Sequence, residues 1–193
     1  GVAILSKHSI KDIKIGFQND YDHKNARLIA GTISGVRIMN VYIPQGQTTE
    51  SDKFKYKLEF FSELIQEIQY LKDLDITYAV MGDFNVAPET KDLSNPESMQ
   101  NKVSFHPKEH ELLSKIKETG LSDVFRKFNQ QDKQYSWWDF RTRGFERGEG
   151  MRIDYILCNS VLTSSCQACI IDTEARKKDR PSDHAPVIAE FLF

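Results

Sequence analysis

The chain has 193 residues and a formal net charge of −2, with 39% hydrophobic and 28% charged residues. This length and composition are typical of one globular domain, which we expect to span residues 1–193. No apolar run approaches the roughly 18 residues that a membrane span needs. The net charge argues against non-specific binding along nucleic acid, but it does not exclude a local basic face.

A β-hairpin is predicted in the first quarter of the chain. Residues 28–33 and 36–42 are β-branched and apolar, and a Ser-Gly dipeptide between them supplies the turn. The second of these strands leaves Tyr42 near its exit. The opening residues 1–7 are also strand-like, so we expect a strand there.

The hydrophobic period becomes helical from Ser51 to about residue 74. Apolar residues recur there at steps of three and four, which predicts one apolar stripe, and charged residues are expected to fill the outer face. Ser51 is the expected N-cap. A buried strand over residues 76–81 follows directly, and this strand–helix–strand order is typical of α/β proteins.

Polar residues follow that buried strand. It is expected to stop at Gly82, so that Asp83 and Asn85 are lifted out of the core by a loop. In α/β sheets, chemistry is concentrated beyond the carboxyl ends of the strands. An Asp can hold Mg²⁺ or accept a proton from water, and an Asn can orient a phosphate. On their own these residue types fit an ordinary turn equally well.

The middle of the chain is predicted as a loop over residues 85–104, followed by a helix. That helix runs from Pro107 to about Thr119 and stops at a glycine. His106 and His110 lie four residues apart, which would suit a metal on one helix face. No acidic pattern accompanies them, so we expect two surface histidines.

The last third contains a buried acid and three cysteines. Asp154 interrupts an apolar strand over residues 151–157, and a charge in that place needs a partner, for which we expect His184. The odd number of cysteines favours reduced thiols in a cytoplasmic protein. Cys166 and Cys169 lie in a predicted strand over 166–172, where they would point to opposite faces, and a final strand begins at residue 187.

Two basic clusters flank these motifs. Residues 126–152 hold seven Lys or Arg against four Asp or Glu, beside Trp137 and Trp138. A second cluster covers residues 176–180. Clusters of this kind are more often solvated faces than binding sites, but here they bracket the other polar residues.

The polar residues without a structural explanation share one chemistry. They are Tyr42, Asp83, Asn85, Asp154, Asp183 and His184. Carboxylate, amide and imidazole groups together suit the Mg²⁺-assisted attack of water on a phosphate. The charged form of His184 would be favoured by contact with Asp154.

Five blocks make the sequence similar to one known family. They are Asn40-Val41-Tyr42-Ile43-Pro44-Gln45-Gly46, Gly82-Asp83-Phe84-Asn85, Tyr135-Ser136-Trp137-Trp138, Arg152-Ile153-Asp154-Tyr155 and Ser182-Asp183-His184-Ala185-Pro186-Val187. In this order they closely resemble bacterial exonuclease III, the Mg²⁺-dependent apurinic/apyrimidinic (AP) endonucleases and 3′-exonucleases of base-excision repair. The resemblance covers the whole chain and implies a four-layered α/β sandwich of the deoxyribonuclease I-like type.

The resemblance implies a role for each matched residue. Asp83 would orient or activate the attacking water, and Asn85 would help to hold phosphate and water. The dyad His184–Asp154 would contact the scissile phosphate, and Tyr42 would face that phosphate. Asp183, with Asp83 and Asn85, would form the metal site. Trp137 and Met151 would wall a pocket for the base-less sugar, and Arg27 and Arg141 would contact the DNA backbone. At least one of Trp137 and Trp138 is expected in the core.

The same resemblance implies the cofactor and the partner. The cofactor would be Mg²⁺, with Mn²⁺ as the alternative ion, and the partner would be double-stranded DNA with abasic sites or 3′ ends, bound by a monomer that does not act at membranes. In the family, an Asn and a metal-ligating Glu precede the segment that residues 1–7 match, and this sequence carries neither.

We therefore expect an N-terminally incomplete sandwich with weak Mg²⁺ binding, a raw sheet edge and exposed apolar surface. Two other interpretations stay open. One is a catalytically impaired chain that only binds DNA. The other is a phosphodiesterase of the same superfamily with another substrate, such as a phosphoinositide, sphingomyelin or RNA ends.

Overall fold

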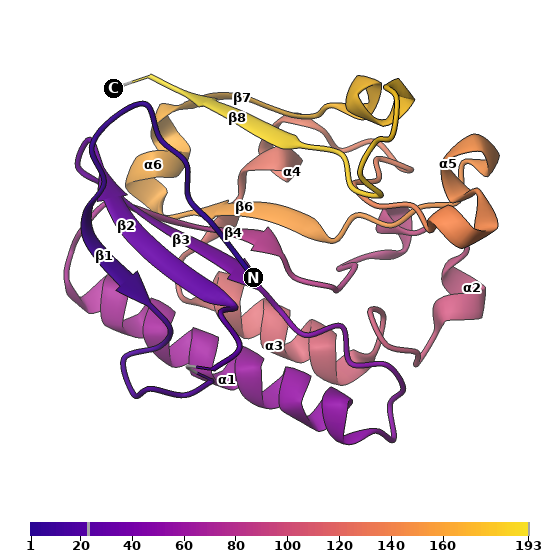
Figure 1. The fold of residues 1–193 in the computed structure, drawn as a ribbon, viewed down its shortest axis with the longest axis horizontal. Coiled ribbons are helices and arrows are strands. Elements are labelled where there is room, and N and C mark those ends of the chain that lie inside the picture. Colours follow the sequence, from indigo (N-terminus) through magenta and orange to yellow (C-terminus); the bar gives the residue numbers. More distant parts are fainter. Residues whose placement is uncertain (23, 193) are drawn as a thin grey trace.

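The computed structural model describes residues 1–22 and 24–192, which form two β-sheets and a set of helices (Figure 1). The strands are β1 (Lys11–Ile15), β2 (Leu28–Ile33), β3 (Val36–Tyr42), β4 (Tyr78–Asp83), β5 (Ser122–Asp123), β6 (Asp154–Cys158), β7 (Cys166–Ile171) and β8 (Val187–Phe191). The helices are α1 (Asp52–Asp73), α2 (Pro96–Met99), α3 (Pro107–Glu118), α4 (Val124–Phe128), α5 (Gly144–Arg147) and α6 (Ser160–Ser165), with 3₁₀ turns η1 (Thr90–Asp92), η2 (Phe140–Thr142) and η3 (Thr173–Lys177).

The larger sheet has the strand order β1-β2-β3-β4-β6-β5, and β7 pairs with β8 in a second sheet. The predicted hairpin is confirmed: β2 and β3 pair antiparallel, and Ser34 and Gly35 both adopt the left-handed conformation that a two-residue turn requires. Helix α1 carries the chain over to β4, which lies parallel to β3. Strand β6 then pairs antiparallel with β4.

Helices α1 and α3 lie side by side against one face of the larger sheet, and β7 and β8 lie on its other side (Figure 1). On the helical face, apolar side chains of α1 and α3 pack against inward-facing residues of β3, β4 and β6. On the opposite face, a second apolar cluster joins the larger sheet to α4, α6 and β7. This mixed sheet with its helices matches the predicted four-layered α/β sandwich of the deoxyribonuclease I-like type.

The strand boundaries correct three expectations. Residues 1–7 form no strand, since only a side-chain bond from Asn40 to the carbonyl of Ala3 ties them to β3. Strand β6 begins at Asp154 rather than at residue 151. Strand β4 continues through Gly82 to Asp83, since both residues still pair with β3 and β6. A side chain does not fit at Gly82, where a Cβ would lie only 2.0 Å from the carbonyl oxygen of Val41.

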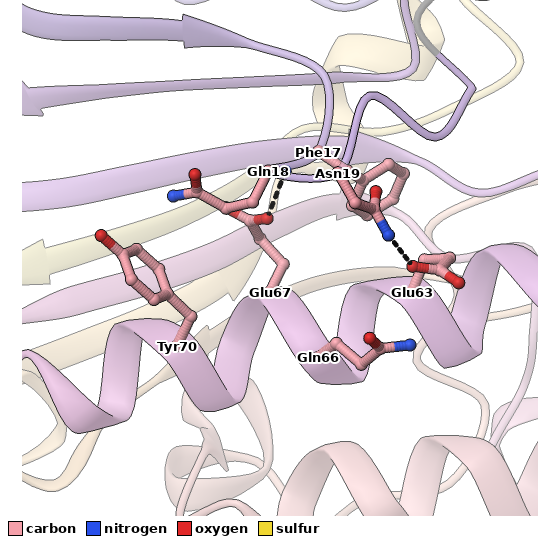
Figure 2. Close-up of a pocket in the computed structure, with 7 residues that line it drawn as sticks. All are labelled: Phe17, Gln18, Asn19, Glu63, Gln66, Glu67 and Tyr70. Atoms are coloured by element: carbon pink, nitrogen blue, oxygen red, sulfur yellow. Dashed lines mark hydrogen bonds between the residues drawn. The ribbon is translucent and has the colours of Figure 1, made fainter.

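The charged residues of α1 are not all on its outer face. Helix α1 has the predicted span and its N-cap Ser51, but Lys57 and Glu67 are buried. Glu67 lies beside a pocket of about 280 Å³ between α1 and the chain after β1, where its carboxylate accepts a 2.9 Å hydrogen bond from the backbone of Gln18 (Figure 2). Burial of these charges is compensated by specific partners, which a helical period does not reveal.

Neither predicted surface histidine is fully exposed. His106 caps α3 by accepting a hydrogen bond from the backbone of Lys108, and a ring nitrogen of His110 lies 2.9 Å from the carbonyl oxygen of Ala87. Cys166 and Cys169 are both buried in one apolar cluster, so the prediction of opposite faces is wrong. The register of β7 shifts after Cys166, and this irregularity breaks the strict alternation of side chains. All three cysteines are free thiols, as expected.

Apolar surface is accessible at several places in the described residues, and two of them lie at the larger sheet. Ile13 and Ile15 are exposed on the edge strand β1. A groove of about 460 Å³ lies beside the larger sheet and is lined mainly by apolar side chains, among them Ile38, Met81 and Val187. Within the described chain, no helix combines the length and the apolar character needed to cross a membrane.

Candidate active site

Two carboxylates lie opposite each other at the carboxyl end of β4. In the β4–β6 ladder Asp83 is the register partner of Asp154, and in the β3–β4 ladder it is the partner of Tyr42. A cleft of about 380 Å³ opens at this point. It is lined by Gly1, Val2, Ala3, Asn40, Val41, Tyr42, Asp83, Asp154 and His184. The structure thus brings four of the six predicted polar residues to one cleft.

The predicted pairing of Asp154 with His184 is confirmed, and it includes a third residue. Nδ1 of His184 lies 2.9 Å from Oδ2 of Asp154. The same carboxylate oxygen accepts a 2.6 Å hydrogen bond from the hydroxyl of Ser136, which is fully buried. Ser136 in turn accepts hydrogen bonds from the backbone amides of Ile153 and Asp154. The dyad is therefore the outer part of a chain of three side chains.

Burial and like charge act together on Asp83. Burial raises the pKa of Asp83 to about 7, and the negative charge of Asp154 adds to that rise. For His184, burial alone lowers the pKa, but the hydrogen bond to Asp154 and the charges of Asp154, Asp83 and Asp183 outweigh it, so the pKa lies above its ordinary value. The cleft therefore favours a protonated imidazole beside carboxylates that repel each other.

Asn85 closes a tight loop around Asp83. Its backbone adopts a left-handed conformation with φ of 53°, its backbone amide donates to Oδ1 of Asp83 over 2.8 Å, and its side-chain amide donates to Oδ2 over 3.0 Å. The second proton of that amide goes to the carbonyl oxygen of Ile43. Both donors are committed within the protein, so Oδ1 is the side-chain atom of Asn85 that is left to meet a ligand.

Trp137 forms part of a wall next to the dyad. Its backbone pairs with Met151 on one side and with His184 on the other, and its indole donates a 3.0 Å hydrogen bond to Asp183. Trp138, by contrast, is buried in a small core cluster, which confirms that one of the two tryptophans is a core residue. Asp183 is thereby fixed in orientation, and Trp137 and Met151 are neighbours as the predicted pocket wall requires.

The two predicted DNA-backbone arginines lie in different surroundings. The guanidinium of Arg27 stacks over the ring of Tyr42, 4.7 Å from its centroid, so it lies beside the cleft. Arg141 is 88% exposed at its side chain and pairs with Asp139 in η2, and it does not line the cleft. Of the predicted basic face, Arg126 and Arg152 are buried and unavailable to a partner.

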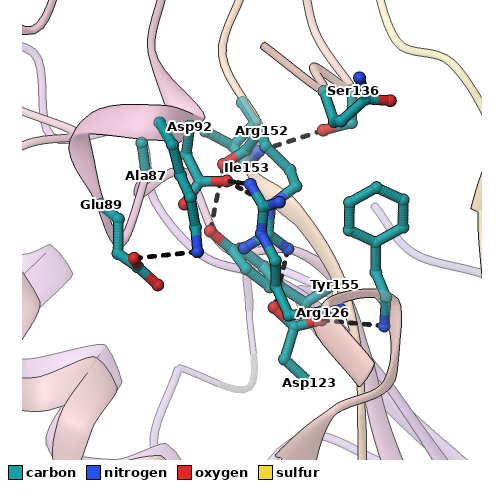
Figure 3. Close-up of polar contacts among 12 residues, drawn as sticks. Ala87, Glu89, Asp92, Asp123, Arg126, Ser136, Arg152, Ile153 and Tyr155 are labelled. Atoms are coloured by element: carbon teal, nitrogen blue, oxygen red, sulfur yellow. Dashed lines mark hydrogen bonds and ion pairs between the residues drawn. The ribbon is translucent and has the colours of Figure 1, made fainter. Parts of the chain in front are cut away.

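The buried Arg126 and Arg152 belong to an ion-pair network with Asp92 and Asp123 (Figure 3). Arg152 donates to Asp92 over 2.6 Å and to Asp123 over 2.8 Å, and Arg126 also pairs with Asp92. The backbone amide of Arg152 donates to the carbonyl oxygen of Asp92. These contacts tie η1 and β5 to the segment that precedes β6, and Met151 is the next residue of that segment towards the N-terminus.

The oxygen donors of the cleft fit a hard divalent cation. Mg²⁺ prefers oxygen ligands and is usually held by one or two carboxylates while it keeps several waters. Asp83 lines the cleft, and Asn85 and Asp183, which are bonded to Asp83 and to Trp137, supply further oxygens beside it. The neighbouring negative charges of Asp83 and Asp154 repel each other, and a cation would offset them. In the described chain, no three His, Cys, Asp or Glu side chains are grouped around one metal position.

Sequence reasoning missed two residues that hold these groups in place. Ser136 appeared only as part of a motif, and Lys57 was assigned to the outer face of a helix. A signal for Lys57 was present, because it occupies a position on the apolar stripe of α1, three residues after Phe54 and seven before Leu64. Nothing in the spacing of Ser136 connects it to Asp154, which lies 18 residues further along the chain.

Replacing Ser136 with Ala is expected to weaken both the site and the fold. The change leaves two buried backbone amides without an acceptor, which should lower the free energy of unfolding by about 1–3 kcal/mol. It also frees the Asp154 carboxylate to rotate, so we expect kcat to fall by about tenfold. Urea denaturation and single-turnover kinetics on Ser136→Ala, with the exposed Ser164→Ala as control, check both effects. Wild-type kinetics in Ser136→Ala would show that Asp154 needs only His184.

Comparison with known proteins places this geometry in a family. Residues 1–184 match the model of the endonuclease/exonuclease/phosphatase family. The chain belongs to this family. Exodeoxyribonuclease III of Haemophilus influenzae is 33% identical over 203 residues, which cover 99% of this chain and 76% of the relative. An exodeoxyribonuclease of Bacillus subtilis is 30% identical, covering 97% of this chain and 72% of the relative.

Solved structures agree with the assignment. A 3′ phosphatase from Neisseria bound to a product DNA hairpin superposes with a TM-score of 0.94 and 34% identity, covering 97% of this chain and 73% of that one. An AP endonuclease from Archaeoglobus fulgidus superposes with a TM-score of 0.88 and is 34% identical, and the match covers 95% of this chain and 72% of that one. The resemblance to exonuclease III is confirmed, and the chain is a family member of the exonuclease III and AP endonuclease type, a group of divalent-metal-dependent nucleases of DNA repair.

Proposed function

We propose that this chain is a Mg²⁺-dependent phosphodiester hydrolase that incises DNA at abasic sites and processes 3′ ends. The single observation that carries the proposal is the cleft in which Asp83 lies opposite Asp154, while Asp154 holds His184. An acid that attracts a proton beside an imidazole that carries one is suited to the attack of water on a phosphodiester. The similarity to exodeoxyribonuclease III and to AP endonucleases supports DNA as the substrate.

A bound Mg²⁺ would offset charge on the phosphoryl oxygens, and Asp83, Asn85 and Asp183 are the residues that would hold it. Mn²⁺ has the same preference for oxygen donors and would serve in its place. The free Oδ1 of Asn85 is suited to this role, because both of its amide protons are already donated within the protein.

The side chains of the cleft divide the remaining work. Asp83, whose pKa is raised to about 7, accepts a hydrogen bond and then a proton from the attacking water. His184 is held through Nδ1, so Nε2 of the charged ring donates to a non-bridging phosphate oxygen and stabilises the charge that develops there. Tyr42 lines the same cleft and presents its phenol to the phosphate.

The wall beside the dyad supports selection of an abasic site. An extrahelical sugar without a base needs a flat apolar surface, and Trp137 next to Met151 supplies one. Arg27, stacked on Tyr42, would meet the charged backbone that flanks the site, and the exposed Arg141 would contact it outside the cleft. The Neisseria neighbour, which is described as bound to a product DNA hairpin, supports a nucleic-acid partner for this surface.

The proposal is tested by incision of a duplex that carries one abasic-site analogue, with and without Mg²⁺. Wild-type protein is expected to cut at the analogue only with the metal, and His184→Ala should lower kcat by about 10²-fold or more because the phosphate loses its donor. The matched control is His8→Ala, an exposed histidine outside the cleft, which should cut like wild type. A folded wild-type protein that shifts the duplex in electrophoresis and leaves it intact in both conditions would contradict the proposal.

A further inference from the structure

Lys57 is a fully buried cation that lies outside the cleft. It belongs to α1, and its side chain has 0% exposure. Its ammonium group pairs with Glu109 and donates to two backbone carbonyls, that of Asn85 over 2.7 Å and that of Gln45 over 3.2 Å. These three partners account for all three of its protons.

The two carbonyls belong to the two loops that carry the cleft residues. Gln45 lies in the loop that follows β3 and Tyr42, and Asn85 lies in the loop that follows β4 and Asp83. Asn85 occupies a left-handed backbone conformation, and its two amides hold both carboxylate oxygens of Asp83. A displacement of the Asn85 carbonyl therefore alters the support of Asp83 directly.

Glu109 holds the other end of this arrangement in place. Its Oε1 accepts a hydrogen bond from the backbone of Ser104 over 3.2 Å, and its Oε2 accepts one from the backbone of His106 over 3.0 Å. Both carboxylate oxygens are thus anchored at the beginning of α3. Lys57 connects α3 to the two loops as one continuous set of contacts.

Stability alone does not call for a charge in this position. Well-packed apolar residues commonly replace a buried ion pair without loss of stability, and Lys57 occupies a position on the apolar stripe of its helix. We propose that Lys57 is a positioning residue, which fixes the loops of Gln45 and Asn85 so that Asp83 and Asn85 keep their reactive arrangement. The inference rests on the proposed phosphodiester hydrolysis. Lys57 never touches the substrate.

The test removes both charges together. Lys57→Met and Glu109→Gln are expected to destabilise the fold singly. The double variant leaves no unpaired charge and should regain part of the stability, although the carbonyls of Gln45 and Asn85 lose their donor. For the double variant we expect kcat on the abasic duplex to fall by about 10- to 100-fold while KM changes less than about threefold. The exposed pair Lys115 and Glu111, changed to Met and Gln, is the matched control and should keep wild-type kinetics.

Glu109→Gln alone separates the contacts of Lys57 from its charge. An amine at position 57 retains donors for both carbonyls even when its carboxylate partner is lost, so this variant should keep kcat within about threefold of wild type below its melting temperature. A double variant with restored stability and wild-type kcat would overturn the proposal, because Lys57 would then serve the fold only. A loss in Glu109→Gln equal to that in Lys57→Met would overturn it as well.

A readout independent of activity separates this inference from the proposed function. The side-chain amide protons of Asn85 are bonded to Asp83 and Ile43, so their NMR signals should exchange slowly with solvent in the wild type. In the double variant we expect their exchange to accelerate by about tenfold or more. Unchanged amide exchange in the double variant would overturn the role of Lys57, whether or not the wild type cuts DNA. A wild type that does not cut would contradict the proposed function, and the exchange measurement would still test the role of Lys57.

Discussion

Asp83→Asn is expected to abolish incision and at the same time to stabilise the fold. The substitution removes the group that accepts the proton of the attacking water, so kcat should fall by about 10³-fold. It also removes the repulsion between Asp83 and Asp154, which lie opposite each other on neighbouring strands. Without metal at pH 8, we expect a net rise of about 1 kcal/mol in the free energy of unfolding, because the relief of repulsion exceeds the loss of the one Asn85 hydrogen bond that an amide nitrogen at position 83 cannot accept.

The sign of the pH dependence follows from the direction of the shift. The pKa of Asp83 is about 7 in the folded chain and lies above its unfolded value, so the folded state binds this proton more tightly. Wild-type stability should therefore fall as the pH rises from about 4 to about 7, relative to Asp83→Asn, and the difference should level off above that range. Thermal denaturation of both proteins in a chelator between pH 4 and 9 measures this difference.

Two controls make the result specific. Asp132→Asn changes an exposed acid and should leave both stability and kcat near the wild type. Addition of Mg²⁺ should raise the melting temperature of the wild type more than that of Asp83→Asn, because ligands that bind only the folded state stabilise it. A variant that melts at or below the wild-type temperature at pH 8 in chelator would show that the two carboxylates do not repel each other as the geometry indicates.

Arg152→Met should strongly destabilise the fold. Arg152 is buried and bonded to both Asp92 and Asp123, and its guanidinium stacks over Tyr155 at 4.7 Å (Figure 3). The variant leaves Asp123 without its arginine, and removal of one partner from a buried pair typically costs about 3–5 kcal/mol. In a chain of this size we expect the melting temperature to fall by about 10 °C.

The pair Arg147 and Glu149 supplies the matched control. Both side chains are exposed and their ion pair is 2.7 Å long, so Arg147→Met should change the free energy of unfolding by less than about 1 kcal/mol. The double variant Arg152→Met with Asp123→Asn should recover part of the loss, because the uncompensated carboxylate is removed. Urea denaturation of the wild type, the two single variants and the double variant measures these free energies of unfolding. Equal stability of Arg152→Met and Arg147→Met would contradict the stabilising role of the buried network.

Local patterns were sufficient to predict the elements that carry their own signals. The β2–β3 hairpin was predicted from its turn residues, and α1 and α3 from their period and caps. The pairing of Asp154 with His184 was also predictable, because a buried carboxylate needs a partner and few residues of suitable chemistry were available. These predictions succeeded where the chemistry or the period leaves few alternatives.

The incorrect predictions concern residues whose environment depends on contacts with distant parts of the chain. Gly82 was interpreted as the end of a strand, whereas it lies within β4, where the carbonyl of Val41 leaves no space for a side chain. Ser136 and Lys57 were missed because their partners, Asp154 and Asn85, lie 18 and 28 residues away in the chain. No periodicity reports such pairs, and a serine hydroxyl or a lysine ammonium in a sequence is far more often in contact with water.

The register of the larger sheet also determines how the site is assembled during folding. Asp83 and Asp154 face each other on the neighbouring strands β4 and β6. Tyr42 is the register partner of Asp83 on β3, and α1 separates these two strands along the chain. Contacts between parts of a chain that are distant in sequence form slowly during folding, because closing the intervening loop lowers the entropy of the chain. The proposed incision activity would therefore be a stringent assay of complete folding, since a state with native helices and an incomplete sheet does not bring the three side chains together.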